Sequence, residues 1–308
     1  MTGFLLLAAA AILLTMGAEL FAEHAGAAGR RLGVSALAVG LVLAGAEPEE
    51  LVTAVSAALR HRPGIAVGDA IGANVTMLTL VLGLAALFRP LPLGRHIRVY
   101  AVAAGCAGVA AALAVLDERL SRIEGAALAS LYVGLVALVW WRERRPPAFG
   151  EAAELEADEQ QGAGTGLALV LVVVGVGGMA IGGRLAVAGA ERVVTALGVG
   201  DTAVGLTFVA LATTAELLAL VWAAARRDVE DLALAGVLGS AAYNATATLG
   251  VAALVRPLTT TGVTGAAWGA AGLPFLLLAA SLRRGVVSRP MGLALLGAYL
   301  GFLVLALT

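Results

Sequence analysis

The chain has 308 residues, of which 60% are hydrophobic and only 13% are charged. Soluble domains carry about 25% charged residues, so this composition excludes an ordinary soluble protein and indicates one that lies within a lipid bilayer. The formal net charge of −1 argues against a nucleic-acid partner, and a single cysteine excludes an internal disulfide.

Apolar runs recur along the whole chain, separated by clusters of Arg, Pro or Gly. A run of about 20 residues is long enough to cross the ~30 Å hydrocarbon core as a helix. Spans longer than this must tilt or break near the middle of the membrane. The runs predict an all-α polytopic membrane protein with ten transmembrane helices, at 3–27, 33–59, 64–88, 97–116, 124–142, 165–190, 201–225, 230–255, 264–282 and 290–307.

A polar and charged segment divides the chain near its centre. Residues 144–164 contain two adjacent prolines and a run of acidic residues, and they predict a solvated cytoplasmic linker. The halves at 1–143 and 165–308 then hold five spans each. Because five is odd, the second half must enter the membrane from the opposite side, which predicts two inverted five-helix repeats.

The arginines are distributed unequally between the loops. Thirteen lie in the odd-numbered loops and six in the even-numbered loops, while Arg184 falls within the sixth span. The positive-inside rule places the odd-numbered loops in the cytoplasm. We therefore expect an integral protein of the plasma or inner membrane with both termini outside.

One segment in each half carries carboxylates inside an otherwise apolar run. The first, at about 34–83, contains GAEPEEL (45–51) and GDAIGAN (68–74). The second, at about 199–250, contains ATTAEL (212–217) and AGVLGS (235–240). A carboxylate at membrane depth is costly and marks a functional site by default. The matching residues Glu50 and Glu216 predict an ion site at the interface between two repeats.

Oxygen-bearing side chains surround the two glutamates in the sequence. Two carboxylates would neutralise a divalent hard cation such as Ca²⁺, and hydroxyl, amide and carbonyl oxygens would complete its coordination. We expect Glu49 to point away from the helix face that Glu47 and Glu50 share. The other candidate ligands are Glu47, Asp69, Asn74, Thr213, Thr214, Ser240 and Asn244.

Several of these residues could instead have a purely structural role. Each glutamate could belong to a structural ion pair with Arg, or could lie solvated at the end of a helix. Asp69, Asn74 and Asn244 could make hydrogen bonds that pack helices together. Small residues such as Gly72 and Ala73 predict close helix approach at the same place.

The two segments resemble the α-repeats of the sodium/calcium exchanger-type family of cation/Ca²⁺ antiporters, which typically read G-T-S-x-P-E-L and G-N-x-I-G-S-N. The resemblance covers essentially the whole chain, including GAEL at 17–20. It implies ten helices in two inverted halves and direct binding of Ca²⁺ by Glu50 and Glu216. It also implies that Thr213, Ser240 and Asn244 contribute to the binding of Ca²⁺ or Na⁺. Alternating access would then arise as the first and sixth helices slide past the others.

The first repeat departs from the family pattern. Ala46 and Ala73 stand where the family has hydroxyls, while Glu47 and Asp69 add carboxylates. Crowded carboxylates repel one another, and a bound proton relieves that repulsion. These departures favour proton coupling, or a different divalent ion, over ordinary Na⁺/Ca²⁺ exchange.

The sequence thus predicts a secondary active antiporter that exchanges a divalent cation, with Ca²⁺ as first candidate, for Na⁺ or H⁺. The alternatives are an antiporter for Mg²⁺ or Mn²⁺ and a passive cation channel. No nucleophile–base pair or metal-ligand spacing supports an enzyme. We expect no resident cofactor; the partners are the transported cations and the lipid bilayer, and the oligomeric state is left open.

Overall fold

The computed structural model describes residues 2–31, 47–94, 97–143, 165–215, 217, 230–283 and 285–308. Within these residues the chain forms ten continuous helical segments, so the predicted all-α architecture is confirmed. The proposed linker at 144–164, residues 34–46 of the first repeat and Glu216 lie outside them. The domain boundaries at 143 and 165 therefore stay predictions.

Three of the ten segments contain an internal π-helical turn. The uninterrupted helices are α1 (Thr2–Arg31), α3 (Pro48–Leu59), α6 (Ile97–Ala114), α7 (Arg122–Glu143), α9 (Thr165–Leu197), α15 (Thr264–Arg283) and α16 (Arg289–Leu307). The others are α4–η1–α5 (Pro63–Thr76, Met77–Val81, Leu82–Phe88), α10–η2–α11 (Asp201–Val204, Gly205–Val209, Ala210–Thr213) and α13–η3–α14 (Glu230–Tyr243, Asn244–Thr248, Leu249–Val255).

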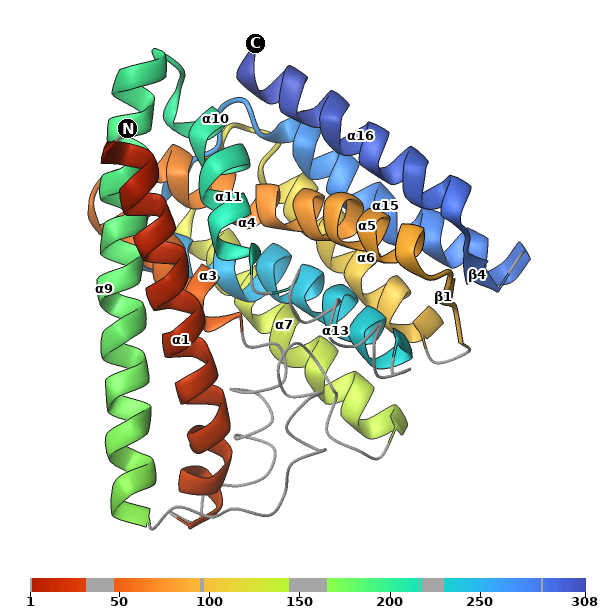
Figure 1. Cartoon of the computed structure of the whole chain (residues 1–308), viewed down its shortest axis with the longest axis horizontal. Coiled ribbons are helices and arrows are strands. Elements are labelled where there is room, and N and C mark those ends of the chain that lie inside the picture. Colours follow the sequence, from red (N-terminus) through yellow and green to blue (C-terminus); the bar gives the residue numbers. More distant parts are fainter. Residues whose placement is uncertain are drawn as a thin grey trace.

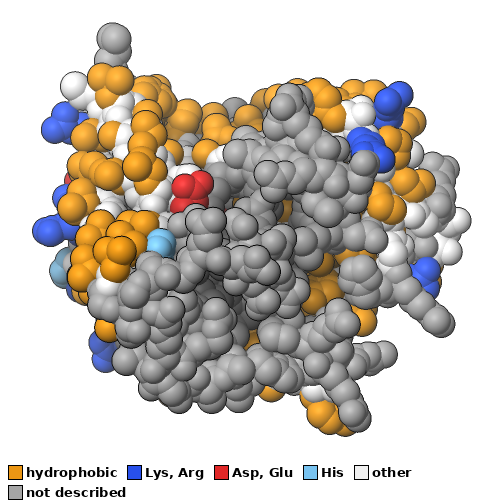
Figure 2. All heavy atoms as spheres, turned by 60° about the horizontal axis from the view of Figure 1, so that its bottom comes forward, with side chains coloured by type: hydrophobic (Ala, Val, Ile, Leu, Met, Phe, Trp, Pro, Cys, Tyr) orange, Lys and Arg blue, Asp and Glu red, His pale blue; other side chains and the backbone are white. Residues whose placement is uncertain are grey.

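The outer surface of the helices suits a bilayer. Among the described residues, six helices are long and apolar enough to cross a membrane by length and composition. Figure 2 shows one face on which apolar side chains cover most of the described surface, with basic side chains toward its edges. Apolar surface of this kind is expected on helices that contact lipid.

The two halves repeat with a constant spacing in their later elements. The segments that contain η1 and η3 begin 167 residues apart (230 − 63), and their π-turns have the same spacing (244 − 77). Four two-residue strands follow it too: β1 (Leu91–Pro92), β2 (Arg119–Leu120), β3 (Leu258–Thr259) and β4 (Val286–Val287). β1 pairs with β4 and β2 with β3, both antiparallel, so each pair joins one strand from each half.

Contacts between loops sort them onto two faces. The β2–β3 pairing joins the fourth and eighth loops. Arg256 bonds to Nε2 of His61 at 3.1 Å, which joins the eighth loop to the second. Thr202 donates to the carbonyl of Thr261 at 3.2 Å, at the sixth and eighth loops. The even-numbered loops therefore gather on one face, here called the even-loop face, while the β1–β4 pairing joins the third and ninth loops.

This separation of loops allows a test of orientation. From the excess of arginines in the odd-numbered loops we predict that the even-loop face and both termini lie outside the cell. Epitope tags at Thr2 and after Thr308 should therefore be labelled by an impermeant reagent on intact cells or spheroplasts. Labelling only after the membrane is permeabilised would reverse the orientation.

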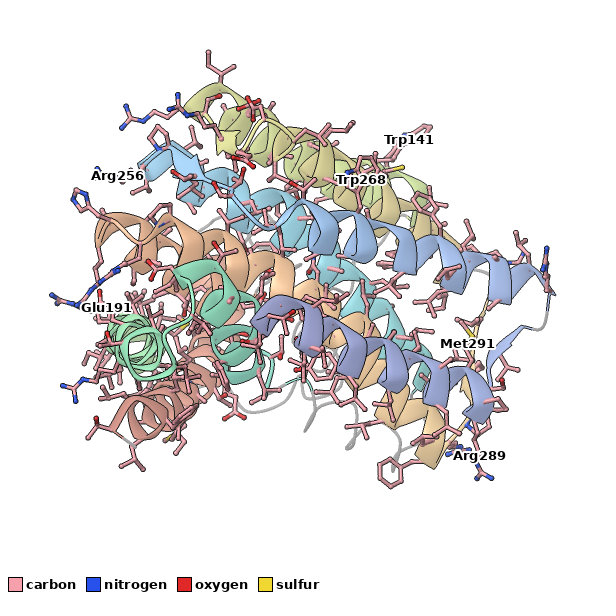
Figure 3. All side chains as sticks on the ribbon, turned by 90° about the horizontal axis from the view of Figure 1, so that it is seen from above. Trp141, Glu191, Arg256, Trp268, Arg289 and Met291 are labelled. Carbon is pink, nitrogen blue, oxygen red and sulfur yellow. The ribbon has the colours of Figure 1, made fainter. Side chains whose placement is uncertain are left out.

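Helices α1 and α9 form a pair at one edge of the molecule (Figure 1). They are inclined steeply to the other helices, and α9 is seen end-on in Figure 3 where α16 runs across the view. Five of their buried side chains form a small hydrophobic cluster separate from the main core: Ala10, Leu14, Ala18, Met179 and Ala186. At the end of the pair where α9 finishes, Leu7, Val187, Ala190 and Val193 belong to the main core instead.

Candidate cation site

The start of α3 carries three acidic residues that are removed from solvent. Pro48 occupies the first helical turn, where its missing N–H costs no hydrogen bond, so Glu47 is the N-cap and Glu49 and Glu50 lie in the first turn. Their exposed fractions are 3%, 3% and 0% for Glu47, Glu49 and Glu50. Carboxylates at a helix start are favoured by its unpaired N–H groups and by the helix dipole.

The burial of Glu49 corrects one expectation. We expected Glu49 to point away from a buried face shared by Glu47 and Glu50, yet Glu49 is as buried as Glu47. The reason is that Glu47 precedes the helix, with φ −97° and ψ 66°, and so does not follow helical spacing. All three acids therefore lie inside the protein.

Two hydrogen bonds between side chains join buried carboxylates of the first half to hydroxyls of the second. The hydroxyl of Ser240 on α13 donates to Oε1 of Glu47. The hydroxyl of Thr213 on α11 lies 3.1 Å from Oδ1 of Asp69 on α4 and donates to it. The structure therefore brings together four of the predicted site residues, each pair spanning the two halves.

The amide residues occupy the same region with different bonding. Nδ2 of Asn74 donates to the carbonyl of Ala241 at 2.9 Å, which is the helix-packing bond considered above, while its Oδ1 has no hydrogen-bond partner among the described residues. Asn244 begins η3, and its Oδ1 accepts a bond from Thr248 at 3.0 Å. Asn74 thus offers an oxygen toward a cation more readily than Asn244 does.

Other buried oxygens in the described part of the site have no protein partner. They include Oδ2 of Asp69 and the hydroxyl of Thr53, both fully buried. Buried polar atoms are usually paired, so orphaned ones suggest a place for an ion or a proton. Thr214, by contrast, donates to the carbonyl of Ala210 at 2.7 Å within its own helix. Thr53 was missed in the sequence, although it lies one helical turn after Glu50.

A second residue missed in the sequence is Tyr243. It is buried at the end of α13, and its ring packs edge-on against Tyr132 of α7 with centroids 5.2 Å apart. The acids Glu47, Glu49 and Glu50 lie close enough for their charges to act on its hydroxyl. Its only signal in the sequence is its position beside Asn244.

Backbone irregularities lie next to these side chains. The turn η2 precedes Thr213, η3 begins at Asn244, and η1 follows α4, which carries Asp69 and Asn74. A π-turn is rare, and single turns of this kind occur frequently at functional sites. They also change the helical register, so side-chain directions beyond them differ from those of a regular helix.

The described acids do not form a metal site by themselves. Within the described residues, no group of three His, Cys, Asp or Glu side chains has the arrangement to hold a metal ion. Glu216, which the repeat pattern predicts as the second principal ligand, lies outside those residues. A complete site would need Glu216 and neutral oxygens in addition to the acids of α3 and α4.

The chain is similar to known proteins over nearly its whole length. It is 29% identical to the antiporter CaxA of Alkalimonas amylolytica over 94% of both chains. It is 26% identical to the inner membrane protein YrbG of Escherichia coli over 74% of this chain and 72% of the relative. A solved structure of the sodium-calcium exchanger NCX_Mj matches with a TM-score of 0.65 and 25% identity, covering 99% of each chain.

A family model shows the relationship for both halves. The model described as sodium/calcium exchanger protein matches residues 2–141 and 167–308. The gap between the two matches falls at the polar segment that divides the sequence. The members of this family are transporters and not enzymes. The chain therefore belongs to the sodium/calcium exchanger family.

Proposed function

We propose that this protein is a secondary active antiporter that moves a divalent cation, with Ca²⁺ as first candidate, in exchange for Na⁺ or H⁺. The observation that carries the proposal is the pair of bonds from Ser240 to Glu47 and from Thr213 to Asp69. Each joins a carboxylate of one half to a hydroxyl of the other. A site built from both repeats changes its surroundings when the repeats move relative to one another.

The chemistry of the donor set supports a hard cation. The side chains at the start of α3 and along α4, α11 and α13 offer carboxylate, hydroxyl and amide oxygens. Oxygen ligands suit Ca²⁺, Mg²⁺ and Mn²⁺, whereas softer metals prefer sulfur or imidazole. Relatives named as an antiporter and as sodium/calcium exchangers support Ca²⁺ as the first ion to test.

The burial of the site supports antiport over passive conduction. Glu50, Asp69, Thr213 and Ser240 are at most 2% exposed. A passive channel needs a continuous polar path that ions can cross without a large rearrangement. Ions could reach these groups only after helices move, which is the behaviour of an alternating-access transporter.

The number of buried acids supports protons as the counter-ion. Glu47, Glu50 and Asp69 are buried, and Glu216 would add a fourth carboxylate. If all four faced one cavity, their charge would exceed what one divalent ion neutralises, and we propose that some of them are protonated when the site is empty. Cation binding then displaces those protons, and transport carries protons in the opposite direction.

Flux into proteoliposomes tests this proposal. Purified protein should take up Ca²⁺ when the liposome interior is more acidic than the outside, and the internal pH should rise as protons leave. The apparent affinity for Ca²⁺ should rise with pH because fewer protons compete. Parallel assays with Mg²⁺, Mn²⁺ and Na⁺ identify the ions. Uptake that needs Na⁺ and is flat from roughly pH 6 to 8 would overturn the proton mechanism but keep antiport. Flux with no counter-ion gradient would indicate a channel.

A further inference from the structure

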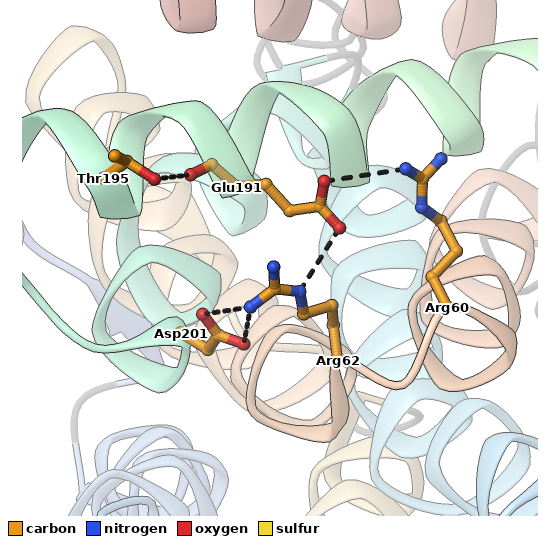
Figure 4. A network of polar contacts seen from close by, with 5 residues as sticks. All are labelled: Arg60, Arg62, Glu191, Thr195 and Asp201. Atoms are coloured by element: carbon orange, nitrogen blue, oxygen red, sulfur yellow. Dashed lines mark hydrogen bonds and ion pairs between the residues drawn. The ribbon is translucent and has the colours of Figure 1, made fainter.

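A cluster of four charged residues lies on the even-loop face (Figure 4). Nε of Arg62 lies 3.2 Å from Oε1 of Glu191, and Nη1 of Arg62 lies 3.3 Å from Oδ2 of Asp201. Arg60 adds a weaker pair with Oε2 of Glu191 at 3.5 Å. The four side chains come from two places that are far apart in sequence, the α3–α4 corner and the joint between α9 and α10.

The basic side of the cluster stands on a rigid corner. The amide of Arg62 donates to the carbonyl of Ala57 at 2.9 Å, and the amide of Ile65 returns a bond to the Arg62 carbonyl at 3.1 Å. Within the turn from Ala57 to Arg62, His61 adopts a left-handed conformation with φ 62°. The backbone of this corner is therefore closed by its own hydrogen bonds, and it fixes where both guanidinium groups begin.

The acidic side of the cluster stands on a joint. Glu191 lies in α9, and Asp201 is the first residue of α10, with Gly198, Val199 and Gly200 between the helices. Gly198 has φ 69°, a conformation that glycine adopts without strain, and a side chain there would meet no atom within 4 Å. Arg62 thus contacts one carboxylate before this joint and one after it.

The joint connects helices that differ in packing. Before it, α9 packs along α1 around a small hydrophobic cluster, and only its last turns add side chains to the main core: Val187, Ala190 and Val193. After it, α10–η2–α11 packs on α4 and ends at Thr213, the partner of Asp69. A change of angle at the joint would move the α1–α9 pair relative to the elements that hold the site.

Charge strengthens the contact. Burial acts to lower the pKa of Arg62, but the charges and hydrogen bonds of Asp201 and Glu191 outweigh it and raise that pKa above its ordinary value. The side chains of Arg62, Glu191 and Asp201 are only 39%, 27% and 26% exposed. Single exposed pairs contribute little, but networks of several partly buried charges contribute more.

The two acidic residues of the cluster have no counterpart in the first half of the sequence. The repeat match of LGVSALAVGL (32–41) with LGVGDTAVGL (197–206) aligns Asp201 with Ala36 and Glu191 with Gly26. The first repeat therefore lacks both carboxylates at the equivalent joint. A contact of this kind on one face favours one of two access states over the other.

We propose that Arg60, Arg62, Glu191 and Asp201 form an electrostatic latch that holds the α9–α10 joint against the α3–α4 corner and opens during each transport cycle. The proposal rests on the antiport function proposed above, because the latch biases the exchange between two access states. It assigns a conformational role to charges that lie outside the cation site.

Spin-label distances test the latch without requiring transport. In a Cys106→Ala background, labels at Leu59→Cys and Ala196→Cys report the distance between the corner and the end of α9. We expect one narrow distance in the parent protein. Asp201→Asn or Glu191→Gln should shift the populations toward a longer distance by about threefold, as should ~1 M salt, which screens exposed charges.

Two further variants sharpen the result. Arg192→Gln removes an exposed charge beside Glu191 and should leave the distances unchanged. Because Arg62→Gln already removes the contact with Asp201, combining it with Asp201→Asn should shift the populations no further than Arg62→Gln alone. Distances that are unmoved by every variant and by salt, or effects that simply add, would overturn the latch.

The latch and the antiport proposal fail in different ways. If the labels respond as expected but no divalent cation is transported by the parent protein, the proposed function is wrong and the electrostatic contact stands. If Ca²⁺ exchange proceeds while the labels do not respond, the function stands and the latch is wrong.

Discussion

Replacing Glu50 by Gln should abolish divalent-cation transport while the protein remains folded in the membrane. Glu50 is fully buried in the first turn of α3, two residues from Pro48 and three from the N-cap Glu47. Gln keeps the size and one acceptor oxygen but removes the charge. Loss of one partner from a buried charge pair costs about 3–5 kcal/mol, which corresponds to a loss of about a hundredfold or more in cation binding.

Proteoliposome uptake of Ca²⁺ measures this effect, with size-exclusion chromatography as the check on folding. Glu216→Gln should be equally inactive, because the repeat motif matches Glu216 to Glu50. Glu49→Gln is the matched control on the same helical turn and should retain more activity, because the repeat motif matches Glu50, and not Glu49, to Glu216. An inactive Glu49→Gln beside a fully active Glu50→Gln would show that Glu49 is the true counterpart of Glu216.

The structure gives that comparison a specific reason. Motif matching separates Glu50 from Glu216 by 166 residues, whereas the elements after the α3–α4 corner repeat at 167 residues. A spacing of 167 would pair Glu216 with Glu49. The spacing between the two repeats is therefore one residue shorter at the glutamate motifs, matched through Glu50, than at the helices that follow them.

The helices and their inverted order could be predicted from sequence because each depends on a local property. An apolar run of about 20 residues predicts a span wherever it occurs. Five such runs on each side of residues 144–164 lead directly to inverted halves. The repeat pattern placed Thr213 and Asp69 in one predicted site, but it did not predict the hydrogen bond between them.

The details that were missed depend on packing between distant elements. The turns η1, η2 and η3 differ from an α-helix by one residue in hydrogen-bond register, and no residue type specifies that change. Tyr243 approaches the acids of α3 only because α13 packs beside the start of α3. The burial of Glu49 was missed because helical spacing was applied to Glu47, which lies before the helix.

The small residues around Gly72 predicted a close approach of helices, and the structure shows α4 in close contact with η2 there. A Cβ atom on Gly72 would lie 2.7 Å from the Cα of Leu206 and closer still to its carbonyl oxygen. On Gly68 it would lie 2.7 Å from the carbonyl of Thr202, and on Gly205 it would lie 2.9 Å from the carbonyl of Ile65. The obstacles are backbone atoms, which cannot rotate away as a flexible side chain can.

Replacing Gly72 by Ala should therefore force α4 and η2 apart. Overpacking of a buried contact costs about 1–3 kcal/mol, and the same movement separates Asp69 on α4 from Thr213 at the end of α11. We expect a lower melting temperature in detergent and Ca²⁺ uptake reduced by about tenfold or more, since ~1.4 kcal/mol is a factor of ten. Gly134→Ala is the control, because a Cβ on Gly134 of α7 would meet no atom within 4 Å and alanine favours helices by up to ~1 kcal/mol. If Gly72→Ala matched Gly134→Ala in both melting temperature and uptake, the close contact between α4 and η2 would not hold the site together.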